Sequence, residues 1–186
     1  MNTSKTILPD VSVVLAVQNV EDVIGRAVRR LADHMRKMDR PFEIVAVNDG
    51  SWDTSFKVLR LLSREMSELK LVEKDVSSRA FIRGSAEASG QSVVLMDAGH
   101  LPSSLSPIGW SLSRLDQGSE AVVVRGRWVA ARRLPALPAI ARPRGRGDMF
   151  ERSFERESRD LAVEVVGTAR RAPSGLLAPV WRLLAA

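Results

Sequence analysis

The stretch that most constrains the fold of this chain is Gln91 to His100, QSVVLMDAGH, in which an apolar run ends at a single acid, Asp97. A short apolar run bounded by turn residues is typical of a strand buried on both faces, and such strands belong to parallel sheets covered by helices. Asp97 would then lie at the carboxyl end of its strand. In open α/β sheets this is the edge where ligands bind.

Two earlier stretches repeat this pattern. Val11 to Val17 leads into Gln18 and Asn19, and Phe42 to Val47 leads into the polar turn 48–51, NDGS. Because the carboxyl ends of parallel strands meet at one edge of a sheet, all three strands should deliver polar side chains to one rim. We expect that rim to be the functional site.

The segments between these strands show helical periodicity. Asn19 is expected to cap the first helix, Asp53 or Thr54 the second, and Gly90 to end the third in a left-handed conformation. The alternation of strands and helices predicts an α/β fold with a doubly wound, mostly parallel sheet. The expected helices span residues 21–40, 54–69, 77–89 and 103–117, and the further strands span 69–72 and 121–124.

The pattern changes after Arg125. Residues 130–148 contain three prolines, two glycines and five arginines, which predicts an irregular basic loop. Residues 149–171 are expected to be helical, and the apolar end of the chain, GLLAPVWRLLAA, to dock on the core, a partner or a membrane. The expected division is a core of residues 1–128 and a basic loop with a C-terminal helical region, 129–186, packed on the core or extending from it.

The positive charge of the chain is concentrated at its C-terminal end. The net charge is +6, but residues 1–120 carry 15 basic and 16 acidic side chains, whereas residues 121–186 carry 13 and 6. This asymmetry favours an anionic partner, which could be a phosphate, a membrane surface or a nucleic acid. A solvated basic tail is the alternative.

Composition also bears on location. The chain has no cysteine, which fits a reducing compartment. The first ten residues lack a signal-peptide pattern, and no stretch approaches the roughly 18 to 20 apolar residues of a membrane span. We therefore expect a cytoplasmic protein that is soluble or peripherally bound to a membrane.

Three fragments together resemble a known family. Residues 11–19 (VSVVLAVQN), 41–55 (PFEIVAVNDGSWDTS) and 79–99 (RAFIRGSAEASGQSVVLMDAG) resemble, in order, three motifs of family-2 glycosyltransferases of the GT-A fold, especially the polyprenyl-phosphate sugar transferases. These motifs are an opening strand and turn, a strand followed by Asp-Asp-Gly-Ser-x-Asp-x-Thr, and a Gly-x-x-x-Ala-x-Gly helix before a strand that ends in Asp-x-Asp. The resemblance covers residues 10–128 and implies a GT-A core that binds a nucleotide-diphosphate sugar of the UDP or GDP type.

The resemblance also implies roles for single residues. Asp49 would accept a hydrogen bond from the base, and Asp97 would hold the ribose or a metal-bound water. The full nucleotide-binding set is Ala16, Gln18, Asn19, Asp49, Ser51, Arg83, Asp97, Arg125 and Arg127, of which the last two arginines could hold a diphosphate without metal. For residues 48–51 the alternative is an Asx-type turn that caps the next helix, and for Asp97 it is a strand-end turn.

The departures from the family pattern concern the metal and the base. Ala16 and Gln18 replace the family's proline and tyrosine, so the aromatic face against the base is missing, and Asn48 replaces the first acid of the second motif. Gly99 replaces the second aspartate of Asp-x-Asp. The implied Mg²⁺ or Mn²⁺ would have Asp97 and His100 as candidate ligands, and one carboxylate beside a glycine is a poor site for a hard cation.

The acceptor side of the family pattern is also incomplete. Asp148 is the best candidate for the general base. The acids that follow it alternate with arginines at i, i+4 spacing and indicate a salt-bridged helix face. No Gln-x-x-Arg-Trp motif is present, and His34, among charged residues of its helix, is expected to be solvated.

Three functions follow. The missing metal ligand favours a glycosyltransferase-like protein with weak or absent activity that binds a nucleotide or nucleotide sugar. The first alternative is an active transferase that acts on a lipid-phosphate or polysaccharide acceptor. The second is a basic nucleic-acid-binding module, disfavoured because Trp128 alone could stack on bases beside the arginines. The chain could also form a homo-oligomer.

Overall fold

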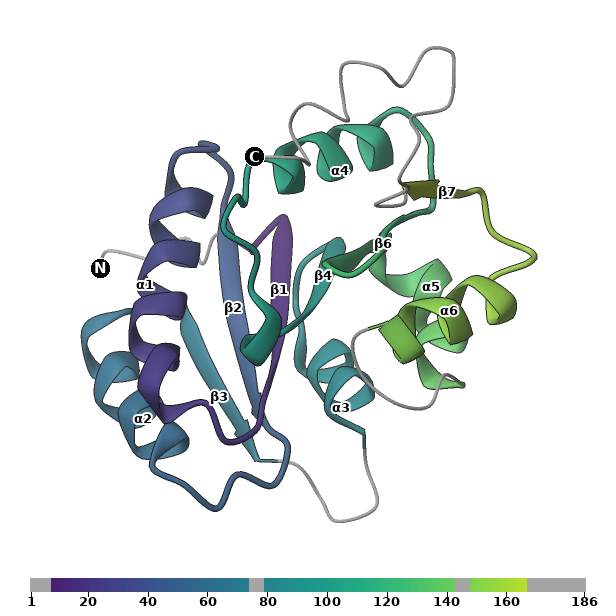
Figure 1. Ribbon diagram of the computed structural model, residues 1–186. Helices are drawn as coiled ribbons and strands as arrows, with labels where there is room; N and C mark the ends of the chain where they lie inside the picture. Colours follow the sequence, from purple (N-terminus) through teal and green to yellow (C-terminus); the bar gives the residue numbers. More distant parts are fainter. Residues whose placement is uncertain (1–7, 74–78, 143–147, 167–186) are drawn as a thin grey trace, which may run out of the picture.

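The computed structural model describes residues 8–73, 79–142 and 148–166 (Figure 1). The apolar runs pair into one seven-stranded sheet in the order β3-β2-β1-β4-β6-β5-β7. The strands are β1 (Val11–Val17), β2 (Phe42–Asn48), β3 (Leu69–Glu73), β4 (Ser92–Asp97), β5 (Ala121–Val124), β6 (Trp128–Arg132) and β7 (Val163–Val166). The helices are α1 (Glu21–Arg36), α2 (Ser55–Glu65), α3 (Ala80–Glu87), η1 (Ala98–His100), α4 (Pro107–Asp116), α5 (Arg133–Ala141) and α6 (Asp148–Glu157).

The strand order reverses direction at the centre of the sheet. The chain first adds β2 and β3 on one side of β1, then returns to place β4 on the other side, with all of these pairs parallel. Ala16 of β1 lies opposite Asp97 of β4, and Val17 lies opposite Asn48 of β2. Three strands therefore end together at a switch point, which confirms the doubly wound, mostly parallel sheet that the sequence predicts.

Helices cover both faces of the sheet, as Figure 1 shows. On one face Val13 and Leu15 of β1 pack in a core shared with α1, α2 and α4. On the other face Val14 and Ala16 pack in a core shared with α3, α5 and α6. Because both faces are buried, every residue of β1 is buried and its sequence shows no polar alternation.

Helix α1 differs from its prediction at both ends. Its N-cap is Val20, whereas Asn19 has a positive φ of 50° and makes no cap, so that assignment was wrong. The helix ends at Arg36 rather than at residue 40, because Asp39 adopts a left-handed φ of 51° that an α-helix cannot include.

The other predicted helices are shorter than expected. Thr54 is the N-cap of α2, as one of the two alternatives had it, but this helix ends where Met66 turns extended. Gly90 was wrongly expected to be a left-handed cap, because Ala88 is the C-cap of α3 in an extended conformation. Gly90 is required for a different reason: a Cβ there would lie 2.7 Å from the backbone nitrogen of Ser12.

The prediction of an irregular loop over residues 130–148 was wrong for the first part of this segment. Strand β6 inserts antiparallel between β4 and β5, and α5 follows it directly. Trp128 is 1% exposed, so this stretch is core in spite of its flanking arginines. The single helix expected over 149–171 was also wrong, since α6 ends at Glu157 and β7 follows at the sheet edge. Residues 143–147 and 167–186, which include the apolar C-terminal run, lie outside the described residues.

Within the described part of the chain, none of the helices is both long enough and apolar enough to cross a membrane.

Candidate functional site

The turn after β2 folds back on the end of β1. Ser51 N donates to Asn48 Oδ1 at 2.9 Å, which confirms the Asx-type turn of residues 48–51. The Ser51 hydroxyl donates to Val17 O at 3.2 Å and accepts from Asn19 N at 3.3 Å. The ends of the first two strands are thus joined by side-chain hydrogen bonds into one rigid part of the rim.

Helix α1 is capped by residues at the start of α2. Val20 N donates to Ser55 Oγ at 2.8 Å, and Glu21 N donates to Asp53 Oδ2 at 3.0 Å. Burial acts to raise the pKa of Asp53, but hydrogen bonds from Ser55 and Glu21 outweigh it and lower the pKa. This cap could not be predicted from residues next to the helix in the chain, because the capping side chains lie more than 30 residues away.

The residues expected around the base occupy different depths of the rim. Ala16 is 1% exposed and lies beneath the surface, among the apolar residues of the α3 face. Gln18 Nε2 donates to Asp49 O at 3.1 Å, and Asp49 itself is nearly buried. Trp52, which sequence analysis did not single out, is 85% exposed, and its backbone N–H donates to Asn19 Oδ1 at 3.0 Å. The rim therefore presents an exposed aromatic ring one residue beyond the Asx turn.

Asp97 lies at the switch point, and its carboxylate turns back on its own chain. Asp97 Oδ1 accepts from Gly99 N at 2.8 Å and lies 3.6 Å from His100 Nδ1. The Asp97 side chain is 13% exposed, whereas that of His100 is 76% exposed. The strand-end turn considered for Asp97 is thus present, and one carboxylate oxygen already has a donor.

These residues do not fit a hard divalent cation. Mg²⁺ and Mn²⁺ take about six ligands that are mostly oxygens, often from more than one carboxylate. At this rim Asp97 is the one carboxylate of the Asp-x-Gly sequence, and the described residues hold no cluster of three or more His, Cys, Asp or Glu side chains suited to a metal. We therefore assign no chemical step at this rim to a metal ion.

The turn between β5 and β6 reaches the same rim beside β4, since Trp128 pairs with Met96. Arg125 donates from Nε and Nη2 to the two carboxylate oxygens of Glu155 at 3.0 and 2.8 Å. Glu151, 4% exposed, accepts from the backbone nitrogen atoms of Gly126 and Arg127 at 2.6 and 3.1 Å. Helix α6 therefore anchors this turn, and a diphosphate would compete with Glu155 for Arg125.

The remaining predicted residues lie elsewhere. Arg83, on α3, forms an ion pair with Glu87 of its own helix at 3.0 Å. Asp148 is the first residue of α6, and its side chain lies outside the part that the structure describes. His34 was wrongly expected to be solvated: it is partly buried, and burial, followed by the charge of Lys37, lowers its pKa.

The acids after Asp148 were expected to pair with arginines along their own helix face, and the structure gives ion-pair partners for three of them. Three of them pair with arginines of other elements. The pairs are Glu155 with Arg125, Glu157 with Arg142 and Glu164 with Arg114.

Solved structures share this fold. The mannosyltransferase PcManGT from Pyrobaculum calidifontis, solved with GDP-Man and Mn²⁺, matches with a TM-score of 0.67 at 18% identity over 91% of this chain and 59% of its own. Glucosyl-3-phosphoglycerate synthase from Mycobacterium tuberculosis, solved with Mn²⁺, UDP and phosphoglyceric acid, matches with a TM-score of 0.64 at 19% identity over 89% and 72%. S. aureus TarS 1-349 matches with a TM-score of 0.62 at 15% identity over 86% and 58%.

This chain thus spans about three fifths of PcManGT and of the TarS fragment. At these identities the likeness establishes the GT-A fold and no more. A search of proteins with curated functions found no significant match. The family model "Glycosyl transferase family 2" matches residues 12–105, which carry β1 to β4 and the whole switch point, and this chain belongs to that family.

Proposed function

We propose that this protein binds a nucleoside diphosphate, or its sugar ester, at the rim formed by β1, β2 and β4, and that it transfers sugar weakly or not at all. The observation that carries this proposal is the state of Asp97. Its carboxylate is at the switch point, where a nucleotide would meet it, yet Oδ1 is bound to Gly99 N–H and the Asp-x-Gly sequence supplies no second carboxylate beside it.

The first part of the proposal, nucleotide binding, rests on the hydrogen-bonded turn that holds Asp49. Asp49 is nearly buried, and its neighbours in the turn are held by Asn48 and Ser51. A fixed carboxylate there could accept a hydrogen bond from a base N–H group, as Asp97 could from a ribose hydroxyl. Relatives in fold were solved with GDP-Man or UDP, which supports a nucleoside diphosphate as the ligand class.

The second part of the proposal, that sugar transfer is weak or absent, follows from the positive charge that the phosphates of the leaving group require. Departure of a nucleoside diphosphate requires a cation or several donors at its phosphates. Those relatives were solved with Mn²⁺, whereas here Gly99 supplies no side-chain ligand. Arg125 is a cation on the same rim that could take this role, but its guanidinium is held by Glu155.

Calorimetric titration of the protein with UDP and with GDP, each with and without Mn²⁺, tests the proposal. We expect one of the two to bind, with an affinity that Mn²⁺ changes little. Asp97→Asn should weaken this binding by about tenfold, since a charge-assisted hydrogen bond contributes about 1.5 to 3 kcal/mol. Asp39→Asn is the control, because Asp39 lies in the turn at the end of α1, far from the rim, and Asn tolerates its left-handed backbone.

Two results would overturn the proposal. Absence of binding by both nucleotides in all conditions would leave the chain a scaffold. Binding that rises steeply with Mn²⁺, together with release of sugar from a UDP- or GDP-sugar, would instead establish the active transferase. In that case Asp148→Asn would test Asp148 as the acceptor-side base.

A further inference from the structure

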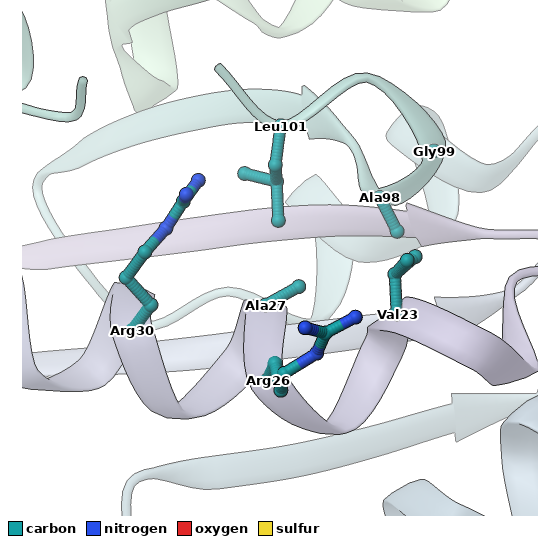
Figure 2. Close-up of a pocket in the computed structure, with 7 residues that line it drawn as sticks. All are labelled: Val23, Arg26, Ala27, Arg30, Ala98, Gly99 and Leu101. Carbon is teal, nitrogen blue, oxygen red and sulfur yellow. The ribbon is translucent and has the colours of Figure 1, made fainter. Parts of the chain in front are cut away.

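A groove runs along α1, on the side that faces residues 98–106. Figure 2 shows its first cavity, of about 380 Å³, beside the first half of α1, where Arg26 and Arg30 rise from the helix and Leu101 points toward it. A second cavity, of about 570 Å³, shares the same two arginines and continues along α1 to Lys37. From Arg26 to Lys37 the helix rises by about 16 Å, at about 1.5 Å per residue.

One wall of the groove is cationic, and two of its charges have no partner. The side chains of Arg26 and Lys37 make no hydrogen bond or ion pair within the described part of the chain. Of the other cations, Arg29 pairs with Glu65, and Arg30 donates to the carbonyl of Pro102. The one acid in the lining, Asp33, pairs with Arg36 outside the groove.

The opposite wall carries hydroxyl groups. The second cavity is lined on this side by Ser103, Ser104 and Ser106, and Ser104 Oγ donates to Ser106 Oγ at 3.3 Å. That bond leaves the Ser106 hydroxyl hydrogen available to a ligand. His34 lines the same cavity, and its lowered pKa, which burial and then Lys37 cause, keeps it uncharged near neutral pH.

The groove contrasts with the C-terminal third, where sequence analysis placed the anionic partner. There Arg125 and Arg142 pair with acids of α6, and Arg132 pairs with Asp116 of α4. The excess positive charge of the sequence in that region is therefore partly neutralised by folding. The balanced N-terminal part instead leaves unpaired cations in a groove.

We propose that the second cavity of this groove, between α1 and residues 103–106, is a binding site for a phosphate group. Guanidinium and ammonium groups on one wall and hydroxyls on the other are the donors that a tetrahedral oxyanion accepts from. The site is separate from the nucleotide rim and does not depend on the proposed function. Its phosphate belongs either to a soluble phosphorylated molecule or to the headgroup of an anionic lipid.

The test uses inorganic phosphate as the probe, titrated into the full chain and followed by backbone amide chemical shifts. We expect saturable shifts at residues 26–37 and 103–106. The double variant Arg26→Gln/Lys37→Gln should weaken binding by at least about tenfold, the factor that about 1.4 kcal/mol represents. The matched control is Lys57→Gln/Arg64→Gln on α2, which removes the same charge from two exposed cations whose side chains also make no hydrogen bond or ion pair among the described residues.

Two further experiments distinguish a soluble phosphorylated ligand from a lipid headgroup. A hexose phosphate is titrated in the same way, and flotation is measured with phosphatidylcholine vesicles that contain or lack phosphatidic acid. Flotation that needs phosphatidic acid and is lost in the α1 variant identifies a lipid headgroup, whereas tighter binding of the hexose phosphate without flotation identifies a soluble ligand.

Equal weakening by the α2 control, or absence of any saturable shift at tens of millimolar phosphate, would overturn the proposal. Asp97→Asn should leave phosphate binding in the groove unchanged, so failure of the nucleotide site and failure of the groove are separate outcomes.

Discussion

Gly84 of α3 lies against Val14 of β1 so closely that no side chain fits between them. A Cβ on Gly84 would be 2.2 Å from Val14 Cγ1 and 2.9 Å from Val47 Cγ2. This glycine opens the Gly-x-x-x-Ala-x-Gly sequence, and its partner Gly90 meets the backbone of Ser12 in the same way. The two glycines let α3 and the start of β4 approach β1, whose end forms the rim.

Gly84→Ala should therefore destabilise the fold. Overpacking of a core typically costs about 1 to 3 kcal/mol, which exceeds the gain of up to about 1 kcal/mol from the higher helix propensity of alanine. Urea unfolding followed by circular dichroism measures the difference. Gly109→Ala in α4 is the control, because its nearest neighbour, Met38 Sδ, is 3.9 Å away, and it should be neutral or stabilising. Equal effects of both substitutions would contradict the close contact.

Glu151→Gln should loosen the turn between β5 and β6. The buried carboxylate holds two backbone N–H groups, and a neutral amide can accept with one oxygen only. We expect a loss of about 1 to 3 kcal/mol in unfolding free energy, with faster amide exchange at Gly126 and Arg127. Glu157→Gln removes the same charge from an exposed pair with Arg142 and should have little effect. Unchanged exchange in the Glu151 variant would show that the carboxylate does not hold the turn.

Gly99→Asp should create or strengthen a divalent-metal site. A side chain at this position fits with shifts of a few tenths of an ångström, since its Cβ would lie 3.3 Å from Asp97 Oδ1 and 3.4 Å from Val20 Cγ1. Two carboxylates separated by one residue supply the oxygen ligands that Mn²⁺ prefers. Electron paramagnetic resonance of free Mn²⁺ measures binding, with Gly99→Asn as the uncharged control. If the aspartate leaves Mn²⁺ affinity unchanged, the metal position assigned to this rim is wrong.

Glu164 should contribute a pH-dependent part of stability. Hydrogen bonding to Arg114, at 2.6 Å from Nη2 to Oε1, is the largest cause that lowers the pKa of Glu164 below its ordinary value of 4.5. A carboxyl with a lowered folded pKa stabilises the protein above its unfolded pKa. This contribution is therefore complete above about pH 4.5 and is lost as the pH falls through the folded pKa.

The measurement is the unfolding free energy of wild type and Glu164→Gln between pH 3 and pH 7. The difference between the two should be largest near neutral pH and should shrink as the pH falls below 4.5 and through the lowered folded pKa, where the carboxylate of the folded wild type takes up its proton. A difference that does not vary with pH would mean that the ion pair with Arg114 does not stabilise the fold.

The strands could be predicted from the sequence where burial is uniform. β1, β2 and β4 are continuous apolar runs because both of their faces are covered. β6 was missed because arginines flank it and because two of its apolar residues are alanine, which is depleted in strands. Its place in the sheet depends on pairing with β4 and β5, which no local pattern in the chain reveals.

The sequence alone determined the family, through its three ordered motifs, and it determined the mostly parallel sheet and the switch point at Asp97 because apolar periodicity and polar strand ends are local properties of the chain. Only the tertiary structure decided which charges are free. Folding pairs Arg125 and Arg142 with distant carboxylates, caps α1 with Asp53 and Ser55 from the start of α2, and leaves Arg26 and Lys37 in a groove. Ion pairs depend on distance in space, and a chain shows only distance in sequence.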